Sequence, residues 1–192
     1  MDKSFFYEKT LHSECIYDGK ILHVYKDDIE LPNKQKGMRE IIRHIGGVCV
    51  IPITAEGEVI CVRQFRYPFG DMIIEIPAGK FDSKNEDHRE AALRELREET
   101  GCRCEKLTYI GKMYGCPAII DEVIYMYMAE GLEIGETDPD EDEFVEVVRF
   151  PIEKLYRMVL DGEIKDGKTQ VAVLKAYAYL NGEKINVSER NQ

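Results

Sequence analysis

Three glutamates, Glu95, Glu98 and Glu99, stand close together in a stretch with the periodicity of a helix. Residues three and four apart occupy neighbouring turns of a helix, so these carboxylates would project toward one region of space. Glu86 and Glu90 extend the acidic field toward the start of the same segment. Like charges at this spacing repel one another, and a bound divalent cation would offset that repulsion.

The alternative is a solvated surface helix in which Arg94 and Arg97 pair with Glu90 and Glu98. The segment before the helix argues against this alternative. Pro77-Ala78-Gly79 ends a short apolar strand and predicts a tight turn with accessible carbonyl groups. Mg²⁺ favours carboxylate, carbonyl and water oxygens, together with the phosphates of a substrate. These residue types therefore suit a magnesium site.

The spacing of these residues resembles the Nudix box. The resemblance is carried by Gly79, Glu86 and residues 94–102, which read Arg-Glu-Leu-Arg-Glu-Glu-Thr-Gly-Cys. Two features depart from the family pattern: six residues instead of five separate Gly79 from Glu86, and Cys102 stands where an aliphatic residue is usual. The extra residue falls in the loop at 82–85, so the spacing from Glu86 onward is intact.

The resemblance implies a role for each matching residue. Glu95 and Glu99 would bind Mg²⁺, for which Mn²⁺ could substitute, and the Ala78 carbonyl would complete the metal site. Glu98 would support these ligands, and Arg94 would orient the carboxylates. Water would then attack one phosphorus of a diphosphate, with no covalent nucleophile.

Similarity to the ADP-ribose pyrophosphatase subfamily extends along most of the chain. It is carried by residues 63–66 (Arg-Gln-Phe-Arg), residues 75–79, Pro117 and residues 140–147. In that subfamily the last of these segments supplies a late metal ligand and the catalytic base, which match Glu143 and Glu141. The chain has Cys-Pro-Ala around Pro117 where Ser-Pro-Gly is usual.

Glu122 is a second choice for the catalytic base, because a carboxylate shortly after Pro117 could reach the same site. Arg66 and Glu75 lie in two of the segments that carry the subfamily resemblance, and both are expected to belong to the substrate site. Arg66 is expected to contact the phosphate or ribose of the substrate, and Arg39 is a weaker choice. A guanidinium fork matches phosphate oxygens well. The alternative for Arg66 is a surface arginine paired with one of the many carboxylates. Pro117 is also expected to border the substrate.

The elements that must position these residues predict an α/β fold. Strands are expected over residues 39–44, 48–53, 59–63, 73–76, 107–113, 123–129 and 144–150, and helices over residues 87–100, 152–160 and 169–180. Helices interspersed among strands indicate a mixed β-sheet covered by helices, and the Nudix resemblance implies an α/β/α sandwich. Looser alternation over residues 5–31 predicts a small antiparallel N-terminal β-subdomain before it.

The resemblance further implies a homodimer. N-terminal strands of relatives pack across a two-fold axis, so residues 1–45 would form a dimerisation arm and residues 46–192 the Nudix hydrolase domain. The adenine of the substrate is expected to stack on one aromatic residue of this arm. The choices are Phe5, Phe6, Tyr7, Tyr17 and Tyr25.

The composition restricts the partners and the location. A net charge of −11 opposes binding to nucleic acid or to an anionic membrane. No apolar run approaches the roughly 20 residues that span a bilayer, and residues 1–10 lack the features of a signal peptide. The six cysteines form no CxxC pair, which favours reduced thiols in a cytoplasmic protein.

These observations lead to one principal hypothesis, the Mg²⁺-dependent hydrolysis of ADP-ribose to AMP and ribose 5-phosphate. The first alternative is another nucleoside diphosphate derivative, such as GDP-mannose, another nucleotide sugar or a dinucleotide. The second alternative is a sensor that binds ADP-ribose without hydrolysing it. The intact run from Arg94 to Gly101 favours an enzyme over a sensor.

Overall fold

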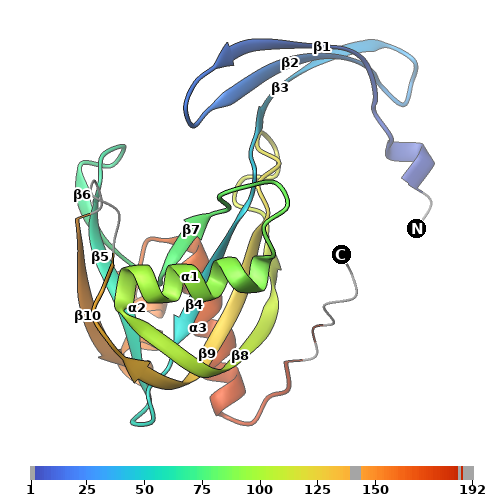
Figure 1. The fold of residues 1–192 in the computed structure, drawn as a ribbon. Helices are drawn as coiled ribbons and strands as arrows, with labels where there is room; N and C mark the ends of the chain where they lie inside the picture. Colours follow the sequence, from blue (N-terminus) through green and yellow to red (C-terminus); the bar gives the residue numbers. More distant parts are fainter. Residues whose placement is uncertain (1–2, 139–143, 186, 188–192) are drawn as a thin grey trace. The chain divides into compact units, whose positions relative to one another are not determined.

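The structure is a computed structural model that describes residues 3–138, 144–185 and 187. Contacts along the chain divide it into two compact units. The first unit comprises Met1–Gly46 and Tyr114–Glu122, and the second comprises Gly47–Met113 and Val123–Gln192. Figure 1 shows the elements of both units in chain order.

The first unit contains an antiparallel three-stranded sheet (Figure 1). A short 3₁₀ turn, η1 (Lys3–Phe6), precedes the strands β1 (Lys9–Asp18), β2 (His23–Glu30) and β3 (Lys36–Arg43), which lie in that order. The strand expected at 39–44 was grouped with the core strands, and this grouping is wrong. β3 pairs with β2 along its full length and therefore belongs to the N-terminal sheet.

β1 is exposed along its whole length within a single chain. Its exposed apolar side chains include Leu11, Ile16 and Tyr17. A three-stranded sheet needs a covered hydrophobic face for stability, whereas the exposed β1 leaves much of its apolar surface uncovered. Its faces are therefore suited to further contacts.

The segment Tyr114–Glu122 belongs to the first unit because it binds the end of β3. The Ile42 amide donates to the Ile119 carbonyl at 2.7 Å, and the His44 amide donates to Asp121 Oδ1 at 2.7 Å. Arg43 forms an ion pair with Asp121 at 3.1 Å. A segment distant in sequence thus joins the N-terminal strands.

The second unit contains two sheets. A four-stranded mixed sheet has the order β7 (Ala78–Lys80), β4 (Gly47–Pro52), β9 (Ile124–Ile134) and β8 (Cys102–Met113). β4 and β9 are parallel, whereas β7 and β8 run antiparallel to their neighbours. The second, antiparallel sheet has the order β10 (Val145–Pro151), β5 (Glu58–Arg66) and β6 (Asp71–Glu75). Mixed pairing agrees with the predicted sheet.

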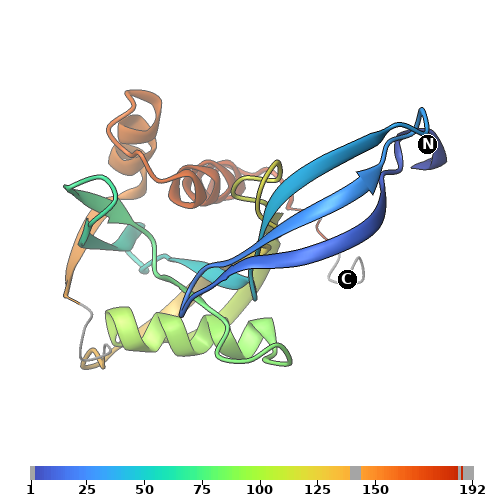
Figure 2. The same ribbon diagram turned by 90° about the horizontal axis from the view of Figure 1, so that it is seen from above.

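Three helices cover these sheets, namely α1 (His88–Thr100), α2 (Ile152–Leu160) and α3 (Gly167–Leu180). Figure 2 shows α1 and α3 on opposite sides of the strands. β4 makes this possible because all its residues are buried and alternate residues point to opposite faces. Cys49 and Ile51 join the core cluster that contains Val173 of α3. The predicted α/β/α sandwich is confirmed.

Local signals fix the ends of α1. The Asp87 carboxylate accepts hydrogen bonds from the amides of Arg89 and Glu90, which caps the first turn. Gly101 ends the helix with φ 70°, a left-handed conformation that glycine adopts without strain. The chain then enters β8 directly at Cys102, whereas the sequence predicted this strand only from residue 107.

The cysteines differ sharply in their exposure. Cys15 and Cys116 are exposed, whereas Cys49 and Cys61 are buried and all six are free thiols. Burial raises the pKa of both Cys49 and Cys61 to about 12. Among the described residues, no helix combines the length and the apolar character that a membrane crossing requires.

Candidate active site

The buried face of α1 carries acidic side chains beside apolar ones. Its buried residues are Ala91, Ala92, Glu95, Leu96, Glu99 and Thr100. The exposed fraction is only 8% for Glu95 and 3% for Glu99, so the alternative of a solvated surface helix is wrong. Burying a carboxylate is costly unless cations or hydrogen-bond donors compensate it. The surroundings of these two residues must supply that compensation.

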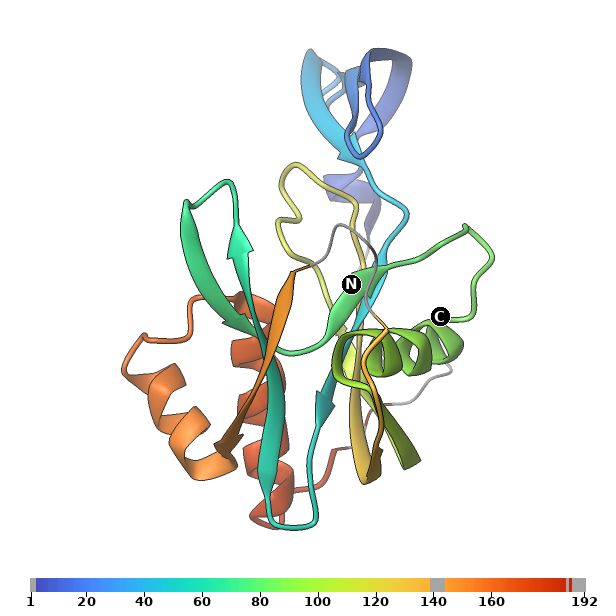
Figure 3. The ribbon, with the colours of Figure 1, turned by 60° about the vertical axis from the view of Figure 1, so that its left-hand side comes forward.

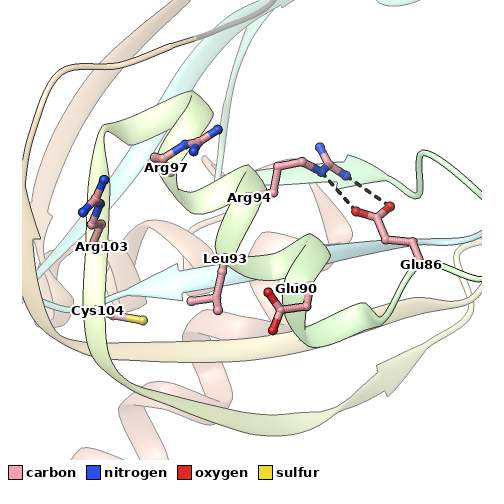
Figure 4. Close-up of a pocket in the computed structure, with 7 residues that line it drawn as sticks. All are labelled: Glu86, Glu90, Leu93, Arg94, Arg97, Arg103 and Cys104. Carbon is pink, nitrogen blue, oxygen red and sulfur yellow. Dashed lines mark hydrogen bonds and ion pairs between the residues drawn. The ribbon is translucent and has the colours of Figure 1, made fainter.

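Arg94 supplies part of the compensation for these buried carboxylates, because it donates hydrogen bonds to several acceptors. Its Nη1 donates to Glu95 Oε1 at 2.7 Å and to Glu98 Oε2 at 3.1 Å. Its Nε donates to Glu86 Oε1 at 3.1 Å, a contact drawn in Figure 4, and its Nη2 donates to the Lys80 carbonyl at 3.2 Å. Burial lowers the pKa of Arg94, but the three glutamates outweigh burial and leave this pKa raised. Arg94 thus lies where an orienting residue would stand.

Glu86 closes the loop that contains the extra residue. Its Oε2 accepts a hydrogen bond from the Asp82 amide at 2.6 Å. Burial raises the pKa of Glu86, but this amide and Arg94 together leave the pKa lowered. The insertion therefore bulges between Asp82 and Glu86 while Glu86 still reaches Arg94.

The strand end at residues 77–80 approaches α1 very closely. The sequence predicted a turn at Pro77-Ala78-Gly79, but Ala78–Lys80 form β7, because they pair with β4. The Ala78 amide donates to Glu99 Oε2 at 3.0 Å. A Cβ atom at Gly79 would overlap the carboxylate of Glu95, so the absence of a side chain at Gly79 leaves the room that this carboxylate occupies.

The chemistry of this donor set fits a hard divalent cation. Two buried carboxylates, Glu95 and Glu99, lie beside the backbone of Ala78 and Gly79, and oxygen ligands of these kinds bind Mg²⁺. Within the described part of the chain, no three His, Cys, Asp or Glu side chains converge into a metal site. Arg94 donates to one oxygen of Glu95 and to one oxygen of Glu98, so its positive charge offsets part of the repulsion between them.

Arg66 is paired with Glu75 and also faces a cavity. Its Nε and Nη2 donate to the two carboxylate oxygens of Glu75 at 2.6 and 2.8 Å. The Glu75 side chain is 3% exposed, whereas that of Arg66 is 41% exposed. The hydrogen bond to Glu75 raises the pKa of Arg66 against the effect of burial, and the charge of Glu99 contributes. Arg66 therefore lies within electrostatic reach of the α1 carboxylates.

The cavity beside Arg66 has a volume of about 650 Å³. It is lined by Arg66, Pro68, Phe69, Asp71, Ile73, Glu75, Lys165, Asp166, Gly167 and Lys168. Figure 3 shows the β5–β6 hairpin beside the connection from α2 to α3, and the lining residues come from these segments and from the first turn of α3. The sequence reasoning missed Lys168 and Asp166. A signal was present, because Asp166 precedes α3 as its N-cap and places Lys168 in the first turn.

A second pocket of about 580 Å³ lies along α1 and β8. Its lining residues are Glu86, Glu90, Leu93, Arg94, Arg97, Arg103 and Cys104 (Figure 4). Neither Glu95 nor Glu99 lines it, because both lie on the buried face of the helix. Leu93 of α1 also borders this pocket.

Three predicted site residues belong to the first unit. Arg39 donates through Nε to Glu8 at 3.1 Å, and Glu122 pairs with His44 at 3.3 Å. Pro117 lies in a turn that the Ile119 amide closes on the Cys116 carbonyl at 3.1 Å. Their predicted roles toward the substrate stay predictions. Glu141 and Glu143 lie outside the described residues.

Comparisons with known proteins match nearly the whole chain. The NUDIX domain model matches residues 43–171, and the model for the nucleoside diphosphate sugar hydrolase N-terminal domain matches residues 8–42. The chain is 44% identical over 168 residues to an ADP-ribose pyrophosphatase of Bacillus subtilis, covering 86% of this chain and 90% of that protein. It is 43% identical over 170 residues to a methanol dehydrogenase activator of Bacillus methanolicus, covering 88% and 91%.

More distant relatives extend the comparison. A GDP-mannose pyrophosphatase of Yersinia pestis is 32% identical over 173 residues, covering 83% of this chain and 85% of that protein. The crystal structure of an ADP compounds hydrolase superposes with a TM-score of 0.82 at 22% identity, covering 94% and 98% of the two chains. The domain match and the 44% identity, together with the α1 site, show that this chain belongs to the Nudix hydrolase family.

Proposed function

We propose that the chain hydrolyses the diphosphate of ADP-ribose to AMP and ribose 5-phosphate, with Mg²⁺ as cofactor and Mn²⁺ as a substitute. The observation that carries the proposal is the pair of buried carboxylates, Glu95 and Glu99, packed against Ala78 and Gly79. The choice of ADP-ribose is supported by the relative named ADP-ribose pyrophosphatase at 44% identity.

In this proposal Glu95, Glu99 and the Ala78 carbonyl hold the cation, with Glu143 as a further ligand. A bound cation would neutralise the diphosphate and acidify water at the site. Arg94 keeps Glu95 and Glu98 in place through its hydrogen bonds, so their positions change little when substrate enters. In this proposal the carboxylates and the carbonyl would bind the cation, and Arg94 orients the carboxylates.

The attacking water must lose a proton as its oxygen bonds to phosphorus and the bridging P–O bond breaks. Glu141 accepts this proton in the mechanism we favour, and Glu122 is the alternative acceptor. The departing phosphate carries away the electrons of the broken bond. Glu141→Gln and Glu122→Gln variants distinguish the two, because only the variant of the true base should lose most of its kcat.

Arg66 contacts the anionic part of the substrate, and Glu75 fixes its guanidinium from behind. We also propose substrate-binding roles for Arg39 and Pro117. We also propose that residues 1–45 form the dimerisation arm and residues 46–192 the hydrolase domain. The exposed apolar side chains of β1 support this role. A cytoplasmic location is proposed from the free thiols.

The test is a substrate panel with purified protein and Mg²⁺, containing ADP-ribose, GDP-mannose, another nucleotide sugar and a dinucleotide. We expect the highest kcat/KM for ADP-ribose. Faster turnover of GDP-mannose would favour the activity named for the Yersinia relative. Absence of turnover with retained binding would favour a sensor.

The same assay tests the metal ligands. Glu99→Gln should reduce kcat/KM at least about 100-fold, because a neutral amide is a poor ligand for a hard cation. Glu90→Gln is the matched control, since Glu90 is exposed on the same helix. Unchanged turnover in Glu99→Gln would refute the assignment of the metal site.

A further inference from the structure

The first turn of α3 is joined to Arg66 by a buried chain of charges. Lys168 Nζ contacts Glu75 Oε2 and also pairs with Asp166 Oδ1 at 3.0 Å. The exposed fraction is 12% for the Lys168 side chain and 3% for that of Glu75. Glu75 holds Arg66 through both of its oxygens. Arg66, Glu75, Lys168 and Asp166 thus form a row of alternating charges.

A second set of hydrogen bonds fixes the same turn to the strand end. Thr169 Oγ1 donates to Asp166 Oδ2 at 2.6 Å and accepts from the Ile76 amide at 2.9 Å. Ile76 is two residues before Ala78, whose amide binds Glu99. Since a hydroxyl can donate and accept at once, Thr169 links the N-cap of α3 to the segment that enters the candidate metal site.

The row of charges, called the charge row below, fixes the orientation of the Arg66 guanidinium at the cavity. Arg66 uses Nε and Nη2 on Glu75, and among the described residues its Nη1 makes no hydrogen bond. Arg66 and Glu75 neutralise each other, and so do Lys168 and Asp166, so the row of four residues carries no net charge. Its effect on an anion therefore comes from the fixed direction in which it holds the Arg66 guanidinium.

We propose that Lys168 is a positioning residue for the hydrolysis, acting on the substrate through Glu75 and Arg66. Lys168 and Arg66 share the carboxylate of Glu75, which holds the guanidinium in a fixed orientation and keeps Nη1 for an anionic oxygen of the substrate. Lys168 itself does not touch the substrate. The inference rests on the proposed function, since it requires a nucleoside diphosphate bound beside Arg66.

Two pKa directions agree with this arrangement. Burial lowers the pKa of Lys168, but Asp166 and Glu75 outweigh burial and leave it raised. Burial raises the pKa of Glu75, but Arg66 and Lys168 leave it lowered. Lys168 and Glu75 are therefore both charged near neutral pH.

The test compares Lys168→Met with Lys106→Met. Lys106 also pairs with a glutamate, Glu130 at 2.5 Å, but it does not line the cavity beside Arg66, and its side chain is 55% exposed. In Lys168→Met we expect KM for ADP-ribose to rise about tenfold with kcat within about twofold of the unmodified chain, because ground-state binding is lost. Lys106→Met should keep both constants.

A double-mutant cycle separates positioning from a purely structural role. In an Arg66→Ala background, Lys168→Met should raise KM no further, because its effect passes through Arg66. Lys168→Arg, which keeps the charge, should restore most of the lost affinity. If Lys168→Met does not fold, as judged by thermal unfolding, Lys168→Gln replaces it, because an amide can still bond to Glu75.

The outcomes distinguish this inference from the proposed function. Equal KM in the unmodified chain and in a folded Lys168 variant would overturn the inference alone. The inference alone would also be overturned if Lys168→Met raised KM by the same factor in the Arg66→Ala background as in the unmodified chain. Failure of the unmodified chain to hydrolyse any diphosphate would instead overturn the proposed function, and the inference with it.

Discussion

Single side chains in this protein are arranged around carboxylates that the fold has buried. Glu75, Glu95 and Glu99 each have an exposed fraction below 9%, and each lies beside a cation or a backbone amide. The sequence predicted Glu95 and Glu99 because fixed spacing on one helix defines a shared face. It did not predict Lys168, because Glu75, the residue through which Lys168 is joined to Arg66, lies on a strand far away in sequence.

The pH dependence of stability should report on Glu75. Its pKa in the folded chain lies below the ordinary value of 4.5. A carboxyl group with a lowered folded pKa stabilises the fold above its unfolded pKa and loses this effect as pH falls through the folded pKa. We therefore expect the free energy of unfolding, measured in urea, to decrease as pH falls below about 4.5.

Glu75→Gln should flatten this acidic decrease, because the amide does not titrate. Glu90→Gln provides the comparison, since Glu90 is exposed on α1 and lies outside the charge row. An equally steep decrease in Glu75→Gln and in the unmodified chain would show that other carboxyl groups control acid stability.

Helices and strands were predictable to different degrees. α1 and α2 lie where the sequence placed them, because caps and apolar periodicity are local signals. β3 was assigned to the core and β7 was taken for a turn, because both depend on partners that sequence alone does not name. The division of the core strands into two sheets was likewise beyond local patterns.

The close approach of β7 to α1 predicts that Gly79 cannot be replaced. In Gly79→Ala the new methyl group would overlap the Glu95 carboxylate, so this carboxylate must leave its place beside Arg94. We expect a loss of about 1–3 kcal/mol in the free energy of unfolding, together with a marked loss of activity. Urea unfolding and the hydrolysis assay measure the two effects.

Gly167→Ala is the matched control, because a Cβ atom there meets no heavy atom within 4 Å. This variant should be as stable as the unmodified chain or slightly more so, since alanine lowers the entropy of the unfolded state. Equal stability of the two variants would mean that the structure accommodates a side chain at residue 79.

At the scale of the whole molecule, the chain forms two units of different character. The unit that begins at Gly47 has an extensive apolar core, whereas the N-terminal sheet leaves β1 exposed. The sequence indicated separate N-terminal strands, but it gave no sign that Tyr114–Glu122 joins them, because that contact consists of a few hydrogen bonds and the pairs Arg43–Asp121 and His44–Glu122.

The proposed dimer can be tested on β1. Ile16 is 49% exposed in the single chain, and Ile16→Glu would place a charge in an apolar subunit contact. We expect this variant to be monomeric in size-exclusion chromatography with light scattering, while the unmodified chain is dimeric. Leu160→Glu on α2, where the leucine is 53% exposed, should leave the dimer intact. Identical masses for the unmodified chain and Ile16→Glu would contradict the proposal.

The uneven exposure of the cysteines makes selective labelling feasible. Cys15 and Cys116, the two exposed thiols, both belong to the first unit, whereas Cys49 and Cys61 are buried with their pKa values raised to about 12. Because maleimides react with accessible thiolates, brief treatment should label the first unit preferentially. A spin label or fluorophore at Cys15 would then report distances between N-terminal sheets without any engineered cysteine.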